Sequence, residues 1–198
     1  IHEALDSGIA MGGPTRYERE LADLLCERFP SIEQVRFCNS GTEANLMALS
    51  TARVVTGRNK LLAFKDGYHG GVIKFLGGVC ALNMPFDFVL ADYNDIDGTA
   101  DLIDDIGDAL AGVIIEPVLG AGGNIQGNRQ FLEMLRQKTE EIGALLIFDE
   151  VKTARLGPGG VQGMLGFNAD LTTMGKFIGG GLPTGAFGGS AEIMAQFD

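Results

Sequence analysis

The sequence predicts an α/β fold in which a mainly parallel sheet of about seven strands is flanked by helices. Short apolar runs alternate along the chain with segments of helical periodicity, which is the pattern of repeated β-α units. Runs such as 144–148 are apolar on both faces, as expected for strands covered on both sides. Because there is no internal repeat and no linker, the 198 residues are expected to form a single domain over 1–198.

Seven strands and four helices follow from these patterns. The strands are expected at 35–38, 61–64, 88–91, 113–115, 144–148, 171–174 and 186–188, the last of them as a further edge of the sheet. The helices are expected at 14–29, 41–55, 99–106 and 129–142. Pro14 suits the first turn of the first helix, while Gly57 and Gly143 are natural C-caps of the second and the fourth.

The composition argues against several classes of function. With 15 Lys and Arg against 26 Asp and Glu, the net charge of −11 argues against nucleic acid or an anionic membrane as the main partner. No apolar run is long enough to cross a membrane, and no signal peptide is recognisable. The three scattered cysteines do not suggest a metal site and fit a reducing compartment, so a cytoplasmic location is expected.

Polar residues gather where the predicted strands end. Ligands bind beyond the carboxyl ends of the strands in such sheets, so side chains that follow the strands should converge on one site. These residues are Ser40, Gly41, Thr42, Tyr68, His69, Glu116, Asp149 and Lys176. Their convergence on one edge of the sheet is the main argument from the residues for a ligand site.

Ser40, Gly41 and Thr42 stand at the predicted N-terminus of a helix. Backbone N–H groups, two hydroxyls and the positive end of the helix dipole make this segment a candidate phosphate site. Gly41 would let an anion approach the backbone closely. The alternative is a plain N-cap, because Ser and Thr are common at that position.

Asp149 and Lys176 are the candidate reactive groups. Asp149 ends an apolar strand, and a buried carboxylate needs several hydrogen bonds or a cationic partner such as a protonated pyridine nitrogen. Lys176 lies between an apolar strand and Phe177-Ile178, and a lysine in an apolar, partly dry site can act as an amine nucleophile. The alternatives are a carboxylate that caps a loop and a solvated surface lysine.

Tyr68 and His69 complete the candidate set. Tyr68 could stack on a planar ring, and His69 could hydrogen-bond to a ligand, although a lone histidine is more often structural. Other templates do not match the sequence, which has no P-loop, no G-x-G-x-x-G after a strand, no G-x-S-x-G elbow and no zinc-ligand spacing.

Five short motifs occur in order along the chain. They are Asn39-Ser40-Gly41-Thr42-Glu43-Ala44, Gly67-Tyr68-His69-Gly70, Glu116-Pro117, Phe148-Asp149-Glu150-Val151 and Thr172-Thr173-Met174-Gly175-Lys176. Over essentially the whole chain they resemble the class III (ω) aminotransferases, fold-type I enzymes that use pyridoxal 5′-phosphate. Within that class the sequence is most similar to β-amino acid (β-phenylalanine) aminotransferases and to glutamate-1-semialdehyde 2,1-aminomutase.

The resemblance implies a role for each candidate residue. Lys176 would carry pyridoxal phosphate as a Schiff base and move the substrate proton, and Asp149 would pair with the pyridine nitrogen. The phosphate would be held by Ser40, Gly41 and Thr42. The ring would be bounded by Tyr68 and Val151, with Glu116 close by and His69 as a further cofactor-binding residue.

The resemblance also implies that family members have segments and a domain beyond those found in residues 1–198. Residues 1–198 would be the cofactor-binding large domain, without the family's N-terminal segment, its C-terminal small domain and the substrate-binding arginines they provide. Family members are usually homodimers, in which the partner subunit lends a phosphate-binding threonine. Lys152 departs from the family pattern, because an uncharged Gln or Met usually stands there.

The expected function is transfer of an amino group from a β-amino acid, or a similar amine, to a keto acid such as 2-oxoglutarate. One alternative is the aminomutase, which returns the amino group to the neighbouring carbon of the same molecule. Another is a fragment that binds pyridoxal phosphate without catalysis. No metal is expected.

Overall fold

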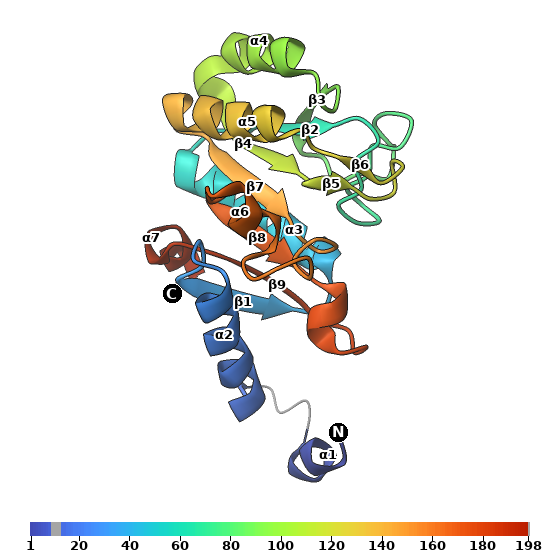
Figure 1. Cartoon of the computed structure of the whole chain (residues 1–198), viewed down its shortest axis with the longest axis vertical. Coiled ribbons are helices and arrows are strands. Elements are labelled where there is room, and N and C mark those ends of the chain that lie inside the picture. The colour runs from blue at the N-terminus through green and yellow to red at the C-terminus, as the bar shows by residue number, and fades with distance from the viewer. Residues whose placement is uncertain (9–12, 198) are drawn as a thin grey trace.

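A seven-stranded sheet forms the centre of the computed structural model, which describes residues 1–8 and 13–197 (Figure 1). The strands of this sheet are β1 (Gln34–Cys38), β2 (Lys60–Phe64), β3 (Asp87–Ala91), β4 (Leu110–Ile115), β7 (Leu145–Asp149), β8 (Leu171–Met174) and β9 (Gly185–Gly189). Across the sheet they lie in the order β1-β9-β8-β7-β4-β2-β3. Five of them, β3, β2, β4, β7 and β8, form one parallel block. The predicted α/β fold with a mainly parallel sheet is confirmed.

Helices cover this sheet on both sides (Figure 1). In the described ranges the α-helices are α1 (His2–Ser7), α2 (Arg16–Arg28), α3 (Gly41–Thr56), α4 (Ile96–Ile106), α5 (Arg129–Ile142), α6 (Gly160–Leu165) and α7 (Ala191–Met194). Short 3-10 turns are η1 (Gly107–Ala109), η2 (Lys176–Gly179) and η3 (Ala195–Phe197), and β5 (Val118–Leu119) pairs with β6 (Ile125–Gln126) as a separate hairpin.

The central strands are buried on both faces because successive side chains point to opposite sides. On β4 and β7, Ile114 and Ile147 pack in a core with Leu49 of α3. Their neighbours Ile115 and Phe148 point the other way, into a core that includes residues of α4 and α5. All six residues of β4 are buried, which explains its unbroken apolar sequence.

The ends of two predicted helices are set by cap residues. Gly57 ends α3 in the left-handed conformation with φ 68°, as the sequence predicts. Pro14 does not lie in the first turn of α2, which is a correction to the expectation. Thr15 is the N-cap there, because its hydroxyl accepts the N–H of Glu18 and the Glu18 carboxylate accepts the N–H of Thr15.

The expected edge position of 186–188 is wrong. This segment belongs to β9, which lies between β8 and β1 and is antiparallel to both, so β1 forms that edge of the sheet. The five residues Gly-Ala-Phe-Gly-Gly are all buried, but mostly small residues give no alternating pattern from which burial can be predicted.

None of the described helices is both long enough and apolar enough to cross a membrane. The described residues also contain no group of three His, Cys, Asp or Glu side chains placed to hold a metal ion.

Candidate active site

Eight of the nine candidate residues line one cavity of about 130 Å³ at the carboxyl ends of the parallel strands. The eight are Gly41, Thr42, Tyr68, His69, Glu116, Asp149, Val151 and Lys176. Three residues outside the candidate set complete the lining, and they are Asn45, Gly70 and Lys152. The predicted convergence of these segments on one edge of the sheet is therefore confirmed.

Ser40 is the candidate that does not line the cavity. Its Oγ accepts the N–H of Glu43 at 3.2 Å and caps α3, which is the plain role left open for this segment. Gly41 and Thr42 form the first turn of the helix, where backbone N–H groups have no carbonyl partner within the helix. Both line the cavity, so the positive end of a 16-residue helix lies at its wall.

Close packing at this helix end requires glycine at two positions. A Cβ on Gly41 would lie 2.7 Å from Cγ2 of Val151, and Gly70 has φ 129° with its backbone against the Thr42 side chain. A larger residue at Gly41 would displace the Val151 side chain, and one at Gly70 would displace the Thr42 side chain, and both of these side chains line the cavity. The position of Val151 over the first turn of α3 thus depends on the bare backbone of Gly41.

Asp149 is buried, with 4% of its side chain exposed, and is held by three groups. Its Oδ2 accepts a hydrogen bond from Nδ2 of Asn45 at 2.8 Å and lies 2.8 Å from Nδ1 of His69. Its Oδ1 accepts the N–H of Val151 at 3.0 Å. These donors satisfy the carboxylate in the core, as is expected of a buried Asp.

Asn45 is the main residue that sequence reasoning missed. Its Nδ2 also donates to the carbonyl of His69 at 2.9 Å, and its Oδ1 accepts the hydroxyl of Thr173 at 2.6 Å. The available signal was a polar residue on the apolar face of α3, beside Ala48 and Leu49, with 1% of its surface exposed in the structure. His69 is buried to a similar extent, and its Nδ1 contacts the Asp149 carboxylate.

Glu116 joins two loops beneath the cavity. Its Oε1 accepts the N–H of Tyr68 and its Oε2 the N–H of Gly120, each at 2.9 Å. Burial raises the pKa of the Glu116 carboxyl, and the nearby His69 and the two N–H donors oppose that rise. The exposed Tyr68 ring is therefore placed by a backbone contact to Glu116.

Lys176 begins the 3-10 turn after β8 and has φ 50°, an uncommon conformation for a residue other than glycine. Its side chain is exposed, so the partly dry surroundings expected for it are not found within the described chain. Of its two apolar neighbours in sequence, Ile178 lines a separate groove, while Phe177 lines both that groove and a cavity that Lys176 also lines. Such unusual backbone geometry is common at functional sites.

A second cavity of about 390 Å³ adjoins the first. Val151, Lys152 and Lys176 line both cavities. The rest of the lining of the second cavity is mainly apolar and consists of Val118, Thr153, Arg155, Leu156 and Phe177. The Lys176 amine thus lies where a polar cavity meets a mostly apolar one.

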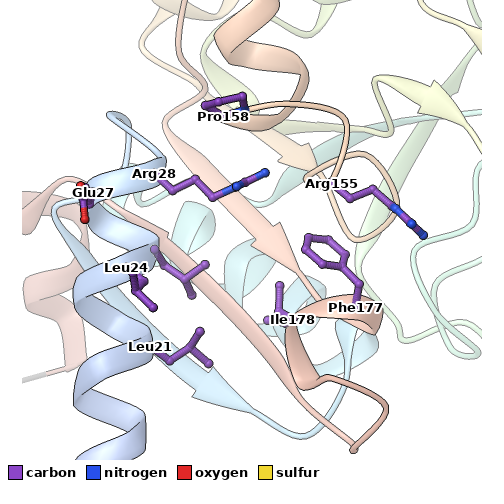
Figure 2. A pocket seen from close by; sticks show the side chains of 9 residues that line it. Leu21, Leu24, Glu27, Arg28, Arg155, Pro158, Phe177 and Ile178 are labelled. Carbon is purple, nitrogen blue, oxygen red and sulfur yellow. The ribbon is translucent and has the colours of Figure 1, made fainter.

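A groove of about 820 Å³ lies between α2 and η2, and none of the nine candidate residues lines it (Figure 2). Leu21 and Leu24 of α2 form one wall of this groove, and Phe177 and Ile178 lie across from them. Arg155 also lines the groove, but its side chain points away from α2 in Figure 2. The groove therefore lacks the buried carboxylate, the Lys176 amine and the helix N-terminus that line the 130 Å³ cavity.

The chain is similar in sequence to curated proteins over its whole length. The chain is 51% identical over 198 residues to the β-phenylalanine transaminase of Variovorax paradoxus, covering all of this chain and 46% of that protein. It is 46% identical over 211 aligned positions to glutamate-1-semialdehyde 2,1-aminomutase 2 of Halalkalibacterium halodurans, covering 99% of this chain and 49% of that protein. The chain thus spans about half the length of these curated relatives.

Solved structures show the same fold. The β-phenylalanine aminotransferase of Variovorax paradoxus matches with a TM-score of 0.97 at 51% identity, covering all of this chain and 46% of that one. An ω-transaminase from Sphaerobacter thermophilus matches with a TM-score of 0.91 at 42% identity, covering all of this chain and 50% of that one. The family model described as aminotransferase class-III matches residues 9–198. On this evidence the chain belongs to the class-III aminotransferases, a family of fold-type I enzymes that depend on pyridoxal phosphate.

Proposed function

We propose that the protein is an aminotransferase that uses pyridoxal phosphate to move the amino group of a β-amino acid to a keto acid such as 2-oxoglutarate. The observation that carries the proposal is the cavity lined by buried Asp149, Lys176 and the first turn of α3. A carboxylate, a primary amine and free helix N–H groups suit the pyridine nitrogen, the aldehyde and the phosphate of this cofactor.

The residues present fit the cofactor. Oδ1 of Asp149 accepts a single hydrogen bond within the described chain, from Val151, and an ionised carboxylate oxygen has room for a further donor such as a pyridinium N–H. Gly41 has no side chain to cover the first turn of α3, and the nearest side chain is that of Val151. The Val151 side chain would pack against one face of the cofactor ring. When bound there, pyridoxal phosphate acts as an electron sink for the carbon that carries the amino group.

Each side chain then has a defined task. Asp149 would keep the proton on the pyridine nitrogen, and Asn45 and His69 hold that carboxylate in place. The Nζ of Lys176 would bind the cofactor, accept the proton from the substrate carbon and return it. The N–H groups of Gly41 and Thr42 would hold the phosphate at the positive end of α3.

A β-amino acid is the proposed donor for two reasons. The 51%-identical relative from Variovorax paradoxus is named for β-phenylalanine. The second cavity supplies an apolar lining, with Val118, Leu156 and Phe177, beside the Lys176 amine, and such a lining suits an aryl side chain.

Conversion of β-phenylalanine by the complete protein, loaded with pyridoxal phosphate, tests this function. With 2-oxoglutarate present, we expect one glutamate for each β-phenylalanine consumed. Without an acceptor, a single turnover per site should occur and then stop. If the loaded protein binds the cofactor but shows no single turnover with any amine, the protein is a cofactor-binding module without catalysis.

The aminomutase is the second candidate, because a relative with that name is 46% identical. An aminomutase returns the amino group to the same molecule and needs no keto acid acceptor. Sustained isomerisation of glutamate-1-semialdehyde without any acceptor would favour it over the transaminase.

We further propose that the chain is the cofactor-binding large domain of a homodimer. Support comes from relatives about twice as long and from the exposed Lys176, which a partner subunit or a further domain would cover. A cytoplasmic location fits the three cysteines, which are unpaired in the structure. The small amino donor and keto acid remain the expected partners.

A further inference from the structure

The loop of residues 151–159 contributes to all three of the hollows described above. It connects β7 to α6. Val151 lines both the first and the second cavity, and Pro158 lines the groove beside α2. Thr153 and Leu156 line the second cavity. The position of this loop therefore determines the walls against which the proposed cofactor and the side chain of the amino donor would pack.

Glu150 binds both ends of the 151–159 loop from within the core. Its side chain is fully buried, with 0% exposed, and it lines none of the three hollows. Its Oε1 accepts the N–H of Val161 at 2.9 Å and that of Gln162 at 3.2 Å, in the first turn of α6. Its Oε2 accepts the hydroxyl of Thr153, near the start of the loop. One carboxylate thus joins the beginning of the loop to the helix at its end.

Gly160 allows the Glu150 carboxylate to lie against the start of α6. Gly160 has φ 62°, and a Cβ at this position would lie 2.6 Å from Oε1 of Glu150. Burial raises the pKa of the Glu150 carboxyl, and the Thr153 hydroxyl and the N–H groups of α6 oppose that rise. Because a carboxylate in the core needs such donors, the same hydrogen bonds that satisfy Glu150 hold the loop and the helix together.

Glu150 and its neighbour Asp149 have different partners, although both carboxylates are buried. The side chains of Asn45 and His69 contact Asp149. The partners of Glu150 belong to the 151–159 loop and to α6. A change at Glu150 can therefore move the loop without removing either of these two partners of Asp149.

We propose, on the basis of the proposed transaminase function, that Glu150 is a positioning residue for the site. It determines how the 151–159 loop lies. Through the loop, it determines where Val151 packs against the cofactor ring and where Leu156 bounds the space for the side chain of the amino donor. Glu150 acts through the reach of its side chain and its two acceptor atoms, and not through its charge.

Two conservative variants separate reach from charge. Glu150→Gln keeps the length of the side chain and one oxygen acceptor for α6, whereas Glu150→Asp keeps the charge but is one methylene shorter. The readout in the complete holoenzyme is the ratio of kcat/KM for β-phenylalanine to that for 3-aminobutanoate, which has a methyl group in place of the phenyl ring. Glu150→Asp should lower this ratio about tenfold, because a displaced loop packs poorly against the ring, and Glu150→Gln should stay within about threefold of the wild type.

This ratio compares two substrates in the same folded enzyme, so a loss of stability alone does not change it. The control is Asp170→Ala, which removes a carboxylate that accepts the N–H of Leu146 and pairs with Arg136 at the amino ends of β7 and β8. It should lower the free energy of unfolding and leave the ratio unchanged. A wild-type ratio in Glu150→Asp overturns the proposal, whether or not Glu150→Gln changes it. An equal loss in Asp170→Ala overturns it as well.

Hydrogen exchange separates this proposal from the proposed function. Exchange of the backbone amides of 151–162, measured by mass spectrometry on the complete protein, requires no turnover of an amino donor. In Glu150→Asp these amides should exchange about tenfold faster than in the wild type, while peptides of α5 exchange at the wild-type rate. That result supports the positioning role even if no β-amino acid is turned over. Equal exchange of 151–162 in both proteins overturns it even if transamination is found.

Discussion

Nδ1 of His69 lies 2.8 Å from Oδ2 of Asp149, and both side chains are buried. At this distance the imidazole donates its Nδ1–H to the carboxylate and fixes the orientation of Asp149. Asn45 donates to the same oxygen, so one edge of the carboxylate faces the protein. The other oxygen, Oδ1, accepts from Val151 and retains capacity for a ligand. This arrangement explains why a carboxylate can remain in the core beneath the proposed cofactor cavity.

Asp149→Asn tests this arrangement. The variant is nearly isosteric but cannot hold a proton on the pyridine nitrogen, so the transamination rate should fall about 100-fold or more. The measurement is single-turnover kinetics with β-phenylalanine at saturating cofactor. Asp170→Asn, in which the altered carboxylate pairs with Arg136 away from the cavity, serves as the control for stability effects. A rate for Asp149→Asn within threefold of the wild-type rate is the result that contradicts the role of Asp149.

Asn45→Ala should destabilise the fold and also release Asp149. The hydroxyl of Thr173 and the carboxylate of Asp149 would each lose a buried partner, which costs about 1–3 kcal/mol in the free energy of unfolding. Urea unfolding of the complete protein measures this cost. Asn128→Ala removes an exposed amide that makes no side-chain cap bond, and should change the stability by less than about 0.5 kcal/mol. Equal stabilities of the two variants would show that the buried network is unimportant.

Gly41→Ala should weaken cofactor binding because its new Cβ would lie 2.7 Å from Cγ2 of Val151. Overpacking of this kind costs about 1–3 kcal/mol, so the Kd for pyridoxal phosphate should rise about tenfold. The double variant with Val151→Ala makes room for the methyl group and should recover part of the affinity. Gly71→Ala is the control, because nothing lies within 4 Å of a Cβ at Gly71. If the double variant binds no better than Gly41→Ala, the contact with Val151 is not the cause.

The pH dependence of stability should report on Glu116. Burial raises the pKa of its carboxyl above the ordinary value of 4.5, so the folded state holds more protons than the unfolded state between these two values. The contribution of Glu116 to stability is therefore largest below pH 4.5 and decreases as the pH rises through the raised pKa. Glu116→Gln cannot titrate, and its unfolding free energy should fall less steeply over this window. Parallel curves for the two proteins, from urea unfolding at a series of pH values, contradict this account.

The sequence predicts the parallel block of the sheet well because its strands have distinctive composition. β4 and β7 are apolar on both faces, and that pattern is typical of strands buried in the middle of a parallel sheet. The place of β9 could not be predicted, since a strand of mostly glycine has no side-chain pattern. The hairpin of β5 and β6 was also missed, because strands of two residues are too short to show periodicity.

Some residues of the candidate site could likewise be predicted from the sequence, and others could not. Residues that follow strands were found by their position, because the carboxyl ends of parallel strands share one edge. Asn45 lies within a helix and Lys152 within a loop, so neither is marked by a strand end. The exposure of Lys176 was not predictable either, since apolar neighbours in sequence do not determine where a side chain points. Local sequence therefore locates the site, while tertiary packing decides which neighbours complete it.

The most direct test of the account is the identity of the lysine that binds the cofactor. The complete holoprotein is reduced with borohydride and digested, and the peptide that carries the pyridoxyl group is identified by mass spectrometry. We predict labelling at Lys176, and no pyridoxyl label at any other lysine in Lys176→Ala. A pyridoxyl group on Lys152, or on any lysine other than Lys176 in the wild-type protein, would contradict the central claim.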